Sequence, residues 1–433
     1  MRIHVPIFPT NFHFLQIAAD GKNEKYKKCL LKCRYVLYSQ MDTLPVDLIL
    51  EFHSFLQKEY DFLSLLSANS TFRPLKFKVL YRKEVKYTQD LIKDVPFYKN
   101  LNLKYFMDSN NFELIPKEIK SLHLNYNFNE PLKPGDIPNF VTNLCLGSEF
   151  NQPLKLGDIP NSVTWLDLGY SFDQPLKPGD IPSSVTNLCL GSEFNQPLKL
   201  GDIPNSVTNL YLGSEFNQPL KPGDIPNSVT DLKLSYFFNQ PLKPGDIPNS
   251  VTNLHLGLNV NRSLKSGSVP NSVTNLHLGL KFNQPLKPKD IPNSVTTLDL
   301  GSSFNRPLNP LDIPNSVTSL YLSRKFNRPL KPGAIPNSVT RLKLGSNFNQ
   351  PLKSGDIPNS VTSLYLSFCF NQPLKPGDIP NSVTDLHLSV CFDQPLKSEN
   401  LPKSINRITI KNNSYSYSIP DELKSLVSYK NKE

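Results

Sequence analysis

Residues 216–234 read FNQPLKPGDIPNSVTDLKL, and close copies of this stretch return every 22 residues along most of the chain. Aligned on their first residue, thirteen copies follow one another from residue 128 to residue 413 without an insertion. Their first residues are Phe128, Phe150, Phe172, Phe194, Phe216, Phe238, Val260, Phe282, Phe304, Phe326, Phe348, Phe370 and Phe392. A fixed period of this length is typical of stacked repeats, in which each unit contacts only its neighbours.

Composition excludes several classes of protein. The chain has 433 residues and 40 Pro, of which 34 lie between residues 106 and 413, so an array of long helices is excluded there. No apolar run of about 18 residues is present, and the sequence therefore predicts no membrane-spanning helix. Residues 1–105 hold 17 Lys+Arg against 10 Asp+Glu, which accounts for most of the net charge of +10. The repeats carry little excess charge, which does not favour nucleic-acid binding.

Each unit has one strand and one irregular arm. Apolar residues occupy positions 1, 5, 10, 14, 17 and 19 of the unit, counted from the Phe. Positions 17 and 19 alternate with variable positions 16 and 18, which is the period of a half-buried strand. Pro at positions 4, 7 and 11 excludes a helix from the arm. We expect parallel strands about 4.8 Å apart, with Phe over Phe, in a rod roughly 60 Å long.

The ends of the array depart from the pattern, as stacked repeats require. A degenerate fourteenth unit is predicted before residue 128, with Phe106, Ile115 and Leu122 in the matching positions. At the other end, residues 419–426 resemble a shortened closing unit.

The unit resembles the FNIP repeat, which is named for its Phe-Asn and Ile-Pro pairs and is known from social amoebae and from giant viruses that infect amoebae. Phe150-Asn151 and Ile159-Pro160 carry the resemblance. It implies a mostly-β fold: a leucine-rich-repeat-like parallel β-solenoid of about 14 coils over residues 106–413, with a C-terminal cap over 414–433. Phe stands near the place where leucine-rich repeats usually have their Asn ladder, so we expect backbone bonding between coils to differ there.

Function is expected where the units differ, because packing explains the shared positions. Positions 16 and 18 project from one face of the predicted strands. Aromatic residues and Arg supply anchors in protein interfaces. The predicted target-binding residues are Trp165, Tyr211, His255, His277, Tyr321, Arg341, Tyr365 and His387. A merely solvated sheet face remains the alternative.

Other rows of polar residues are interpreted conservatively. Lys at position 6 and Asp at position 9 form parallel rows of opposite charge, which favours a solvated edge over a phosphate-binding stripe. His255 and His277 should stack on adjacent coils, but two imidazoles are an incomplete zinc set, so neither a metal nor another cofactor is predicted. Cys369 and Cys391 lie one coil apart, near disulfide distance in principle, and should stay thiols in a reducing compartment.

Residues 41–80 are predicted to form a small α-helical domain, between an N-terminal extension (1–40) and a linker and capping segment (81–105). Thr43 before Pro45 is a plausible helix cap. Met41 is a conceivable alternative start. The apolar order in this segment resembles an F-box. The resemblance implies that six residues bury themselves against a Skp-type adaptor: Leu44, Pro45, Leu48, Ile49, Phe55 and Leu56.

Together the two resemblances imply a substrate-recognition subunit of a cullin-type ubiquitin ligase, located in the cytoplasm, or in the host cytoplasm if the protein is viral. The chain itself needs no catalytic group; its partners would be the adaptor, the cullin ligase and an unknown target protein, and neither nucleic acid nor a membrane. A non-enzymatic interaction scaffold, whose N-terminal helices only cap the solenoid, is the alternative. A repeat enzyme or lectin is disfavoured, because the sequence lacks a unique nucleophile and base constellation.

Overall fold

The protein is described by a computed structural model in two compact units, Met1–Tyr105 and Phe106–Glu433. The described residues are strands β1 (Val85–Lys86) and β2 (Leu103–Phe106), residues 112 and 115, and residues 119–411 and 415–429. β1 and β2 pair in parallel. The predicted extension, the helical domain and all six predicted adaptor-binding residues lie outside the described residues.

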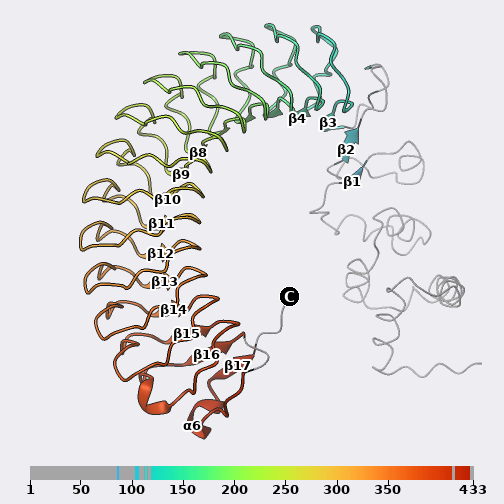
Figure 1. Ribbon diagram of the computed structural model, residues 1–433. Coiled ribbons are helices and arrows are strands. Elements are labelled where there is room, and N and C mark those ends of the chain that lie inside the picture. The colour runs from blue at the N-terminus through green and yellow to red at the C-terminus, as the bar shows by residue number, and fades with distance from the viewer. Residues whose placement is uncertain are drawn as a thin grey trace, which may run out of the picture. The chain divides into compact units, whose positions relative to one another are not determined.

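The second unit is a single parallel sheet that winds through a solenoid (Figure 1). Each strand from β3 onward pairs with the next one along the chain. The strands are β3 (Ser121–His123), β4 (Asn143–Cys145), β5 (Trp165–Asp167), β6 (Asn187–Cys189), β7 (Asn209–Tyr211), β8 (Asp231–Lys233), β9 (Asn253–His255), β10 (Asn275–His277), β11 (Thr297–Asp299), β12 (Ser319–Tyr321), β13 (Arg341–Lys343), β14 (Ser363–Tyr365), β15 (Asp385–Leu388), β16 (Arg407–Ile410) and β17 (Val427–Tyr429).

Residues one sequence period apart lie opposite each other in neighbouring strands. Leu210 of β7, for example, lies opposite Leu232 of β8, and Tyr211 lies opposite Lys233. This shift of 22 residues holds for each pairing from β3 to β16. The predicted parallel solenoid of about 14 coils, with its strands at positions 16 to 18, is therefore confirmed.

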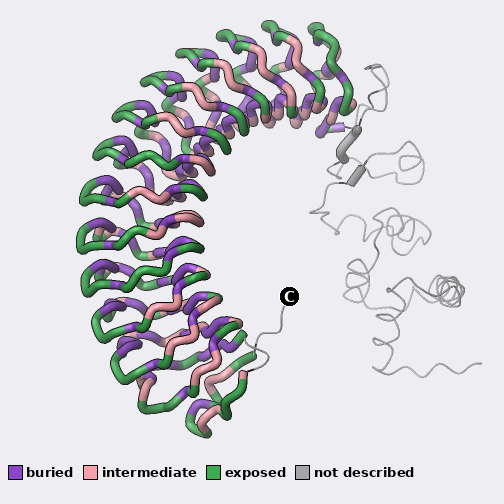
Figure 2. The backbone as a smooth tube through the Cα atoms, viewed as in Figure 1, coloured by how far each residue is buried: buried purple, intermediate pink, exposed green. Residues whose placement is uncertain are grey.

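The core is a continuous file of aromatic rings. Consecutive Phe rings at position 1 have centroids 5.9–6.4 Å apart and planes within 9° of each other. Every one of these rings is almost fully buried, as the inward parts of the coils in Figure 2 are. Val260 interrupts the file, and it too is buried.

The solenoid bends, where the sequence predicted a straight rod (Figure 1). Rings in the core lie about 6.2 Å apart, for example Phe304 and Phe282. On the sheet face, by contrast, the His255 and His277 rings lie 4.2 Å apart, and those of Tyr365 and His387 lie 4.0 Å apart. Because the coils are spaced more widely at the Phe file than at the sheet face, their stack curves toward the sheet. The strands therefore line the inner, concave side.

An Asn ladder joins the coils after all, one residue beyond the Phe. The Asn217 backbone N–H donates to Asn195 Oδ1 at 2.9 Å, and Gln218 Nε2 donates to the Asn195 carbonyl oxygen at 3.0 Å. The backbone bond recurs between every two successive coils from Asn129 to Asp393, at 2.8–3.2 Å, with Asp serving as acceptor at residue 173. Phe and Asn thus divide the tasks of packing and backbone bonding between two adjacent positions.

The Asp row at position 9 is structural, which corrects its interpretation as a solvated edge. Asp158 is 2% exposed, and its Oδ2 accepts the Lys155 backbone N–H at 2.8 Å. Desolvation by burial raises the pKa of Asp158, and the same cause raises the pKa of Asp180. The position 6 lysines are exposed, whereas most of the aspartates close the turn from inside. Sequence could not separate the two rows, because both are charged.

Each end of the Phe file is covered by aromatic residues. Phe112 meets Phe128 edge-on at 5.6 Å, whereas Phe106, predicted to begin the degenerate unit, is instead the last residue of β2. Residues 106–112 lack the Pro-Leu-Lys-Pro-Gly-Asp arm, so the period does not extend there. At the other end Tyr415 stacks on Phe392 at 6.3 Å. Helix α6 (Asp421–Lys424) and β17 then close the array, after a 3-10 turn at Ser398–Asn400.

Candidate functional site

The concave sheet face is the surface on which the coils differ. In β4 to β12 and in β14 the central Leu is buried, and its two neighbours are half-buried with side chains on the opposite side. All eight predicted target-binding residues lie at these positions: Trp165 on β5, Tyr211 on β7, His255 on β9, His277 on β10, Tyr321 on β12, Arg341 on β13, Tyr365 on β14 and His387 on β15. None of them is buried, and Arg341 is exposed.

The structure brings some of these residues together and keeps others apart. The His255 and His277 rings are parallel within 3°, and the Tyr365 and His387 rings within 5°. Trp165 is separated from β7 by the whole of β6. The face therefore offers two stacked ring pairs and several single anchors, rather than one convergent pocket.

Most charged groups on this face have a partner within it. Lys233 Nζ lies 4.5 Å from the centre of the Tyr211 ring. His277 Nδ1 lies 3.6 Å from Asp299 Oδ2. Burial lowers the pKa of His255, and the nearby His277 lowers it further. These histidines are therefore placed for stacking and hydrogen bonding.

A polar chain of position 16 residues runs beside the histidines. Asn275 Nδ2 donates to Asn253 Oδ1 at 2.5 Å, and Asn253 Nδ2 lies 3.4 Å from Asp231 Oδ2. Asp231 Oδ1 is buried and has no hydrogen-bond partner. A buried acceptor without a donor is costly, so a donor brought by a ligand would be stabilised there.

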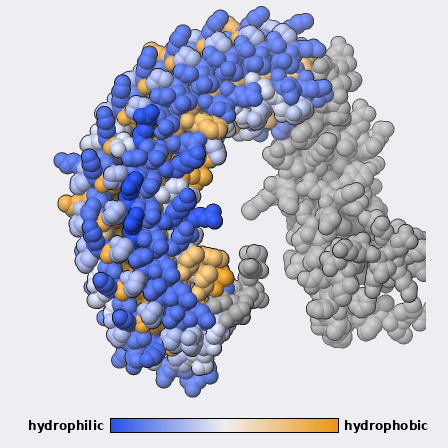
Figure 3. All heavy atoms as spheres, in the orientation of Figure 1, coloured by the Kyte–Doolittle hydropathy of each residue, from blue (hydrophilic) through white to orange (hydrophobic). Residues whose placement is uncertain are grey.

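Sequence reasoning missed the rim of the concave face, formed by positions 21 and 22 after each strand. Exposed apolar residues gather there: Tyr236, Phe237, Leu280 and Phe368. Figure 3 shows two hydrophobic areas along this inner edge, with a hydrophilic stretch between them. The signal was available, because positions 21 and 22 vary from unit to unit as much as positions 16 and 18 do.

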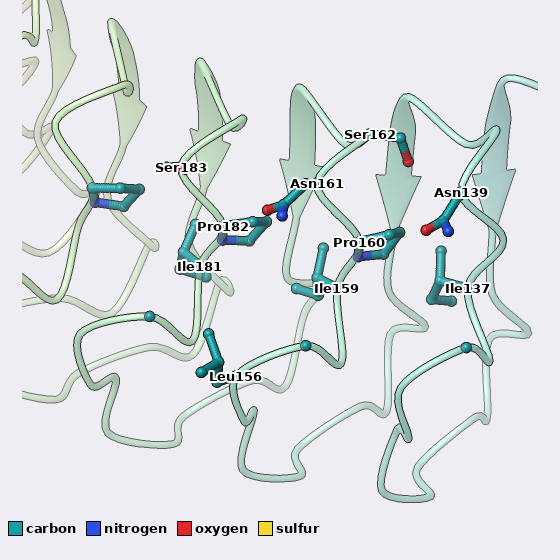
Figure 4. Close-up of a pocket in the computed structure, with 14 residues that line it drawn as sticks. Ile137, Asn139, Leu156, Ile159, Pro160, Asn161, Ser162, Ile181, Pro182 and Ser183 are labelled. Atoms are coloured by element: carbon teal, nitrogen blue, oxygen red, sulfur yellow. The ribbon is translucent and has the colours of Figure 1, made fainter.

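A groove of about 840 Å³ crosses several coils near the start of the solenoid (Figure 4). It lies between the position 8 glycines and the Ile-Pro-Asn-Ser turns, and Leu156, Pro160 and Asn161 are among its lining residues. A similar groove of about 530 Å³ lies over Pro358 and Asn359. Neither groove is lined by an ionisable side chain, so neither offers a general acid or base.

Possible metal and thiol chemistry can be judged from the same coordinates. Within the described residues, no group of three or more His, Cys, Asp or Glu side chains is arranged to hold a metal ion. Burial raises the pKa of the Cys189 thiol to about 12, so Cys189 is not a thiolate near neutral pH. Cys369 is half-buried and Cys391 is exposed, and both are free thiols. In the described parts of the chain no helix has the length and hydropathy of a membrane span.

Comparison with known proteins identifies the repeat. A family model described as FNIP Repeat matches residues 110–149, 128–171, 150–193, 172–199, 194–237, 238–281, 282–325, 326–369 and 370–413. No curated protein matches the sequence. Among solved structures the chain is similar to CroV588, described as a novel circular LRR protein structure, with 30% identity and a TM-score of 0.63.

The two structural matches differ in weight. The match to CroV588 covers 76% of this chain and 52% of that chain, so the chain spans about half the length of that protein. A leucine-rich repeat protein from Bacteroides ovatus matches with 12% identity and a TM-score of 0.20, over 81% of this chain and 88% of that chain. That second match is too distant to inform the fold.

Proposed function

Because the chain belongs to the FNIP repeat family, we propose that it is a non-enzymatic binding protein whose concave sheet face holds a target protein. The observation that carries the proposal is the division of labour within each unit. The shared positions are buried in the core or bonded between coils, while the aromatic, basic and acidic residues that vary are gathered on one curved face. Aromatic residues and Arg in such positions are the usual anchors of protein interfaces.

The finer proposal is that the bound target is presented to a cullin-type ubiquitin ligase. It rests on the F-box-like order of apolar residues between Leu44 and Leu56. A helix that carries these residues would bury its apolar side in a groove of a Skp-type adaptor. The alternative is a scaffold whose N-terminal segment only covers the end of the solenoid.

Target binding is tested on the full chain with a variant that keeps the repeat pattern. Trp165→Asn copies the residue found at the same position in the neighbouring strands, Asn143 and Asn187. We expect proteins cross-linked to the wild-type chain to be lost or reduced with Trp165→Asn. A matched change on the outer corner, Lys331→Asn, copies Asn309 and should leave capture intact. Equal capture by all three proteins would contradict the role of the concave face.

Adaptor binding separates the ligase subunit from the scaffold. Purified full-length chain is mixed with a purified Skp-type adaptor, and complex formation is measured by size-exclusion chromatography. The ligase proposal expects a complex that is lost in Leu44→Ala with Pro45→Ala. Absence of the wild-type complex, or its survival in the double variant, would favour the scaffold.

A further inference from the structure

Four exposed cations lie together where the concave face meets its rim. Arg341 and Lys343 flank the buried Leu342 on β13, and both are exposed, whereas the matching positions of β4 to β12, β14 and β15 are half-buried. Arg324 and Lys325 are exposed in the turn after β12. The Leu322 N–H, two residues before Arg324, donates to the Lys343 carbonyl oxygen at 2.9 Å. We call Arg324, Lys325, Arg341 and Lys343 the basic cluster.

The basic cluster has no counter-charge of its own. In residues 119–411 and 415–429, none of its four side chains forms an ion pair. The strands beside β13 place Ser319 and Ser363 next to Arg341, and Tyr321 and Tyr365 next to Lys343. These neighbours supply hydroxyl groups but no carboxylate.

Other cations on the same face are already engaged, which sets the basic cluster apart. Lys233 lies over the Tyr211 ring, and Arg407 Nε lies 3.6 Å from Asp385 Oδ1. The rim also changes sign along the solenoid. Exposed acidic residues follow β4, β6 and β7, namely Glu149, Glu193 and Glu215. Positive charge without a partner is therefore concentrated at β12 and β13.

An apolar surface adjoins the basic cluster on the next two strands. The Tyr365 and His387 rings stack 4.0 Å apart on β14 and β15. Phe368, in the turn after β14, is 52% exposed. In Figure 3 a hydrophobic area follows the hydrophilic stretch of the inner edge in this direction. A ligand here would meet charge first and an aromatic shelf next.

We infer that the basic cluster anchors a segment of the target protein by an anionic side chain, with a neighbouring apolar residue packed on Tyr365 and Phe368. This inference rests on the proposed function of the concave face and names its partner chemistry. The planar guanidinium of Arg341 can bind an oxyanion through two parallel hydrogen bonds, while Lys343 adds a second charge. A carboxylate and a phosphoryl group share this chemistry.

The test measures peptide binding to the purified full chain by fluorescence anisotropy. Three probes of equal length each carry a Phe next to two variable residues, which are two Glu, two phosphoserines or two Gln. The main variant, Arg341→Ser with Lys343→Tyr, copies Ser319 and Tyr321 of β12, so the sheet should be kept. The control variant, Lys331→Asn with Lys353→Asn, removes the same charge from the outer corner, where Asn309 occurs naturally. Far-UV circular dichroism checks that both variants are folded.

We expect at least one anionic probe to bind about tenfold or more tightly than the Gln probe, and to lose about that much affinity in the main variant. Binding should weaken with added salt and be unchanged in the control variant. The Glu and phosphoserine probes distinguish the two sources of the anion. Equal binding of all three probes, or equal losses in both variants, would overturn the inference. If that happens while capture of a target remains sensitive to Trp165→Asn, the proposed function stands and the basic cluster alone is excluded as its anchor.

Discussion

Removal of one ring from the Phe file should destabilise the protein strongly and locally. Phe216 is fully buried, and its ring lies 6.2 Å from that of Phe194 and 6.4 Å from that of Phe238. Phe→Ala changes in cores cost about 3–5 kcal/mol, depending on how far the site can collapse. Collapse is restricted here, because the Asn ladder and the paired strands hold the coils on both sides at a fixed spacing. We therefore expect Phe216→Ala to cost about 4–5 kcal/mol.

The assay combines guanidinium denaturation with hydrogen exchange. Since each coil contacts only its neighbours, protection should fall in β6 to β8 and remain unchanged several coils away. Val260→Ala is the matched control, because it removes a smaller side chain from the same file and should cost about 2 kcal/mol. A cost for Phe216→Ala no larger than that of the control would refute the reasoning. Faster exchange spread evenly over the whole solenoid would also refute it.

Three further changes have defined outcomes. Ala334 stands where most coils have the turn-closing Asp, so Ala334→Asp should accept the Lys331 N–H and raise the free energy of unfolding by about 1 kcal/mol, measured by denaturant titration; a loss would contradict the role of this row. Leu311 has φ 73°, where other coils have Gly, so Leu311→Gly should raise the melting temperature by relieving about 1 kcal/mol of strain; an unchanged or lower value would count against it. The pKa of His255 is lowered by burial below its unfolded value of about 6.5, so its contribution to stability is full above that pH and is lost as the pH falls through the folded pKa. His255→Tyr, which copies Tyr211, should therefore lose less stability than the wild type between about pH 7 and pH 5, and an unchanged pH slope would contradict this.

The sequence predicted the parts of the fold that repeat as side-chain patterns. The 22-residue period, the alternation around Leu232 and the recurrence of Phe were sufficient to predict the strands and the buried file. The bonds between coils were harder to predict, because they depend on which backbone groups come opposite each other. The Asn217 side chain looked like a motif marker, and its function as an acceptor for the next coil appears only once the spacing of the coils is known.

Charge rows were a second limit of the sequence. Lys155 and Asp158 are three residues apart, and in the sequence both look like solvated side chains. In the structure the turn between them folds the carboxylate back onto the Lys155 N–H, so only the lysine remains at the surface. The concave face could be predicted because its positions alternate with buried Leu. The rim could not, because its residues follow the turn at position 20 and belong to no alternating pattern.

Disulfide trapping in the full chain, with its native cysteines replaced by serine, tests the register on which this account depends. Asn187 and Asn209 lie opposite each other in adjacent strands, whereas Asn187 and Tyr211 are offset diagonally. Opposite Cα atoms in a sheet are about 4.8 Å apart, within disulfide range, and the diagonal pair is roughly 8 Å apart, beyond it. We predict that Asn187→Cys with Asn209→Cys forms a disulfide on mild oxidation and that Asn187→Cys with Tyr211→Cys does not. The reverse result, or equal trapping of both pairs, would contradict the stacking of residues one period apart.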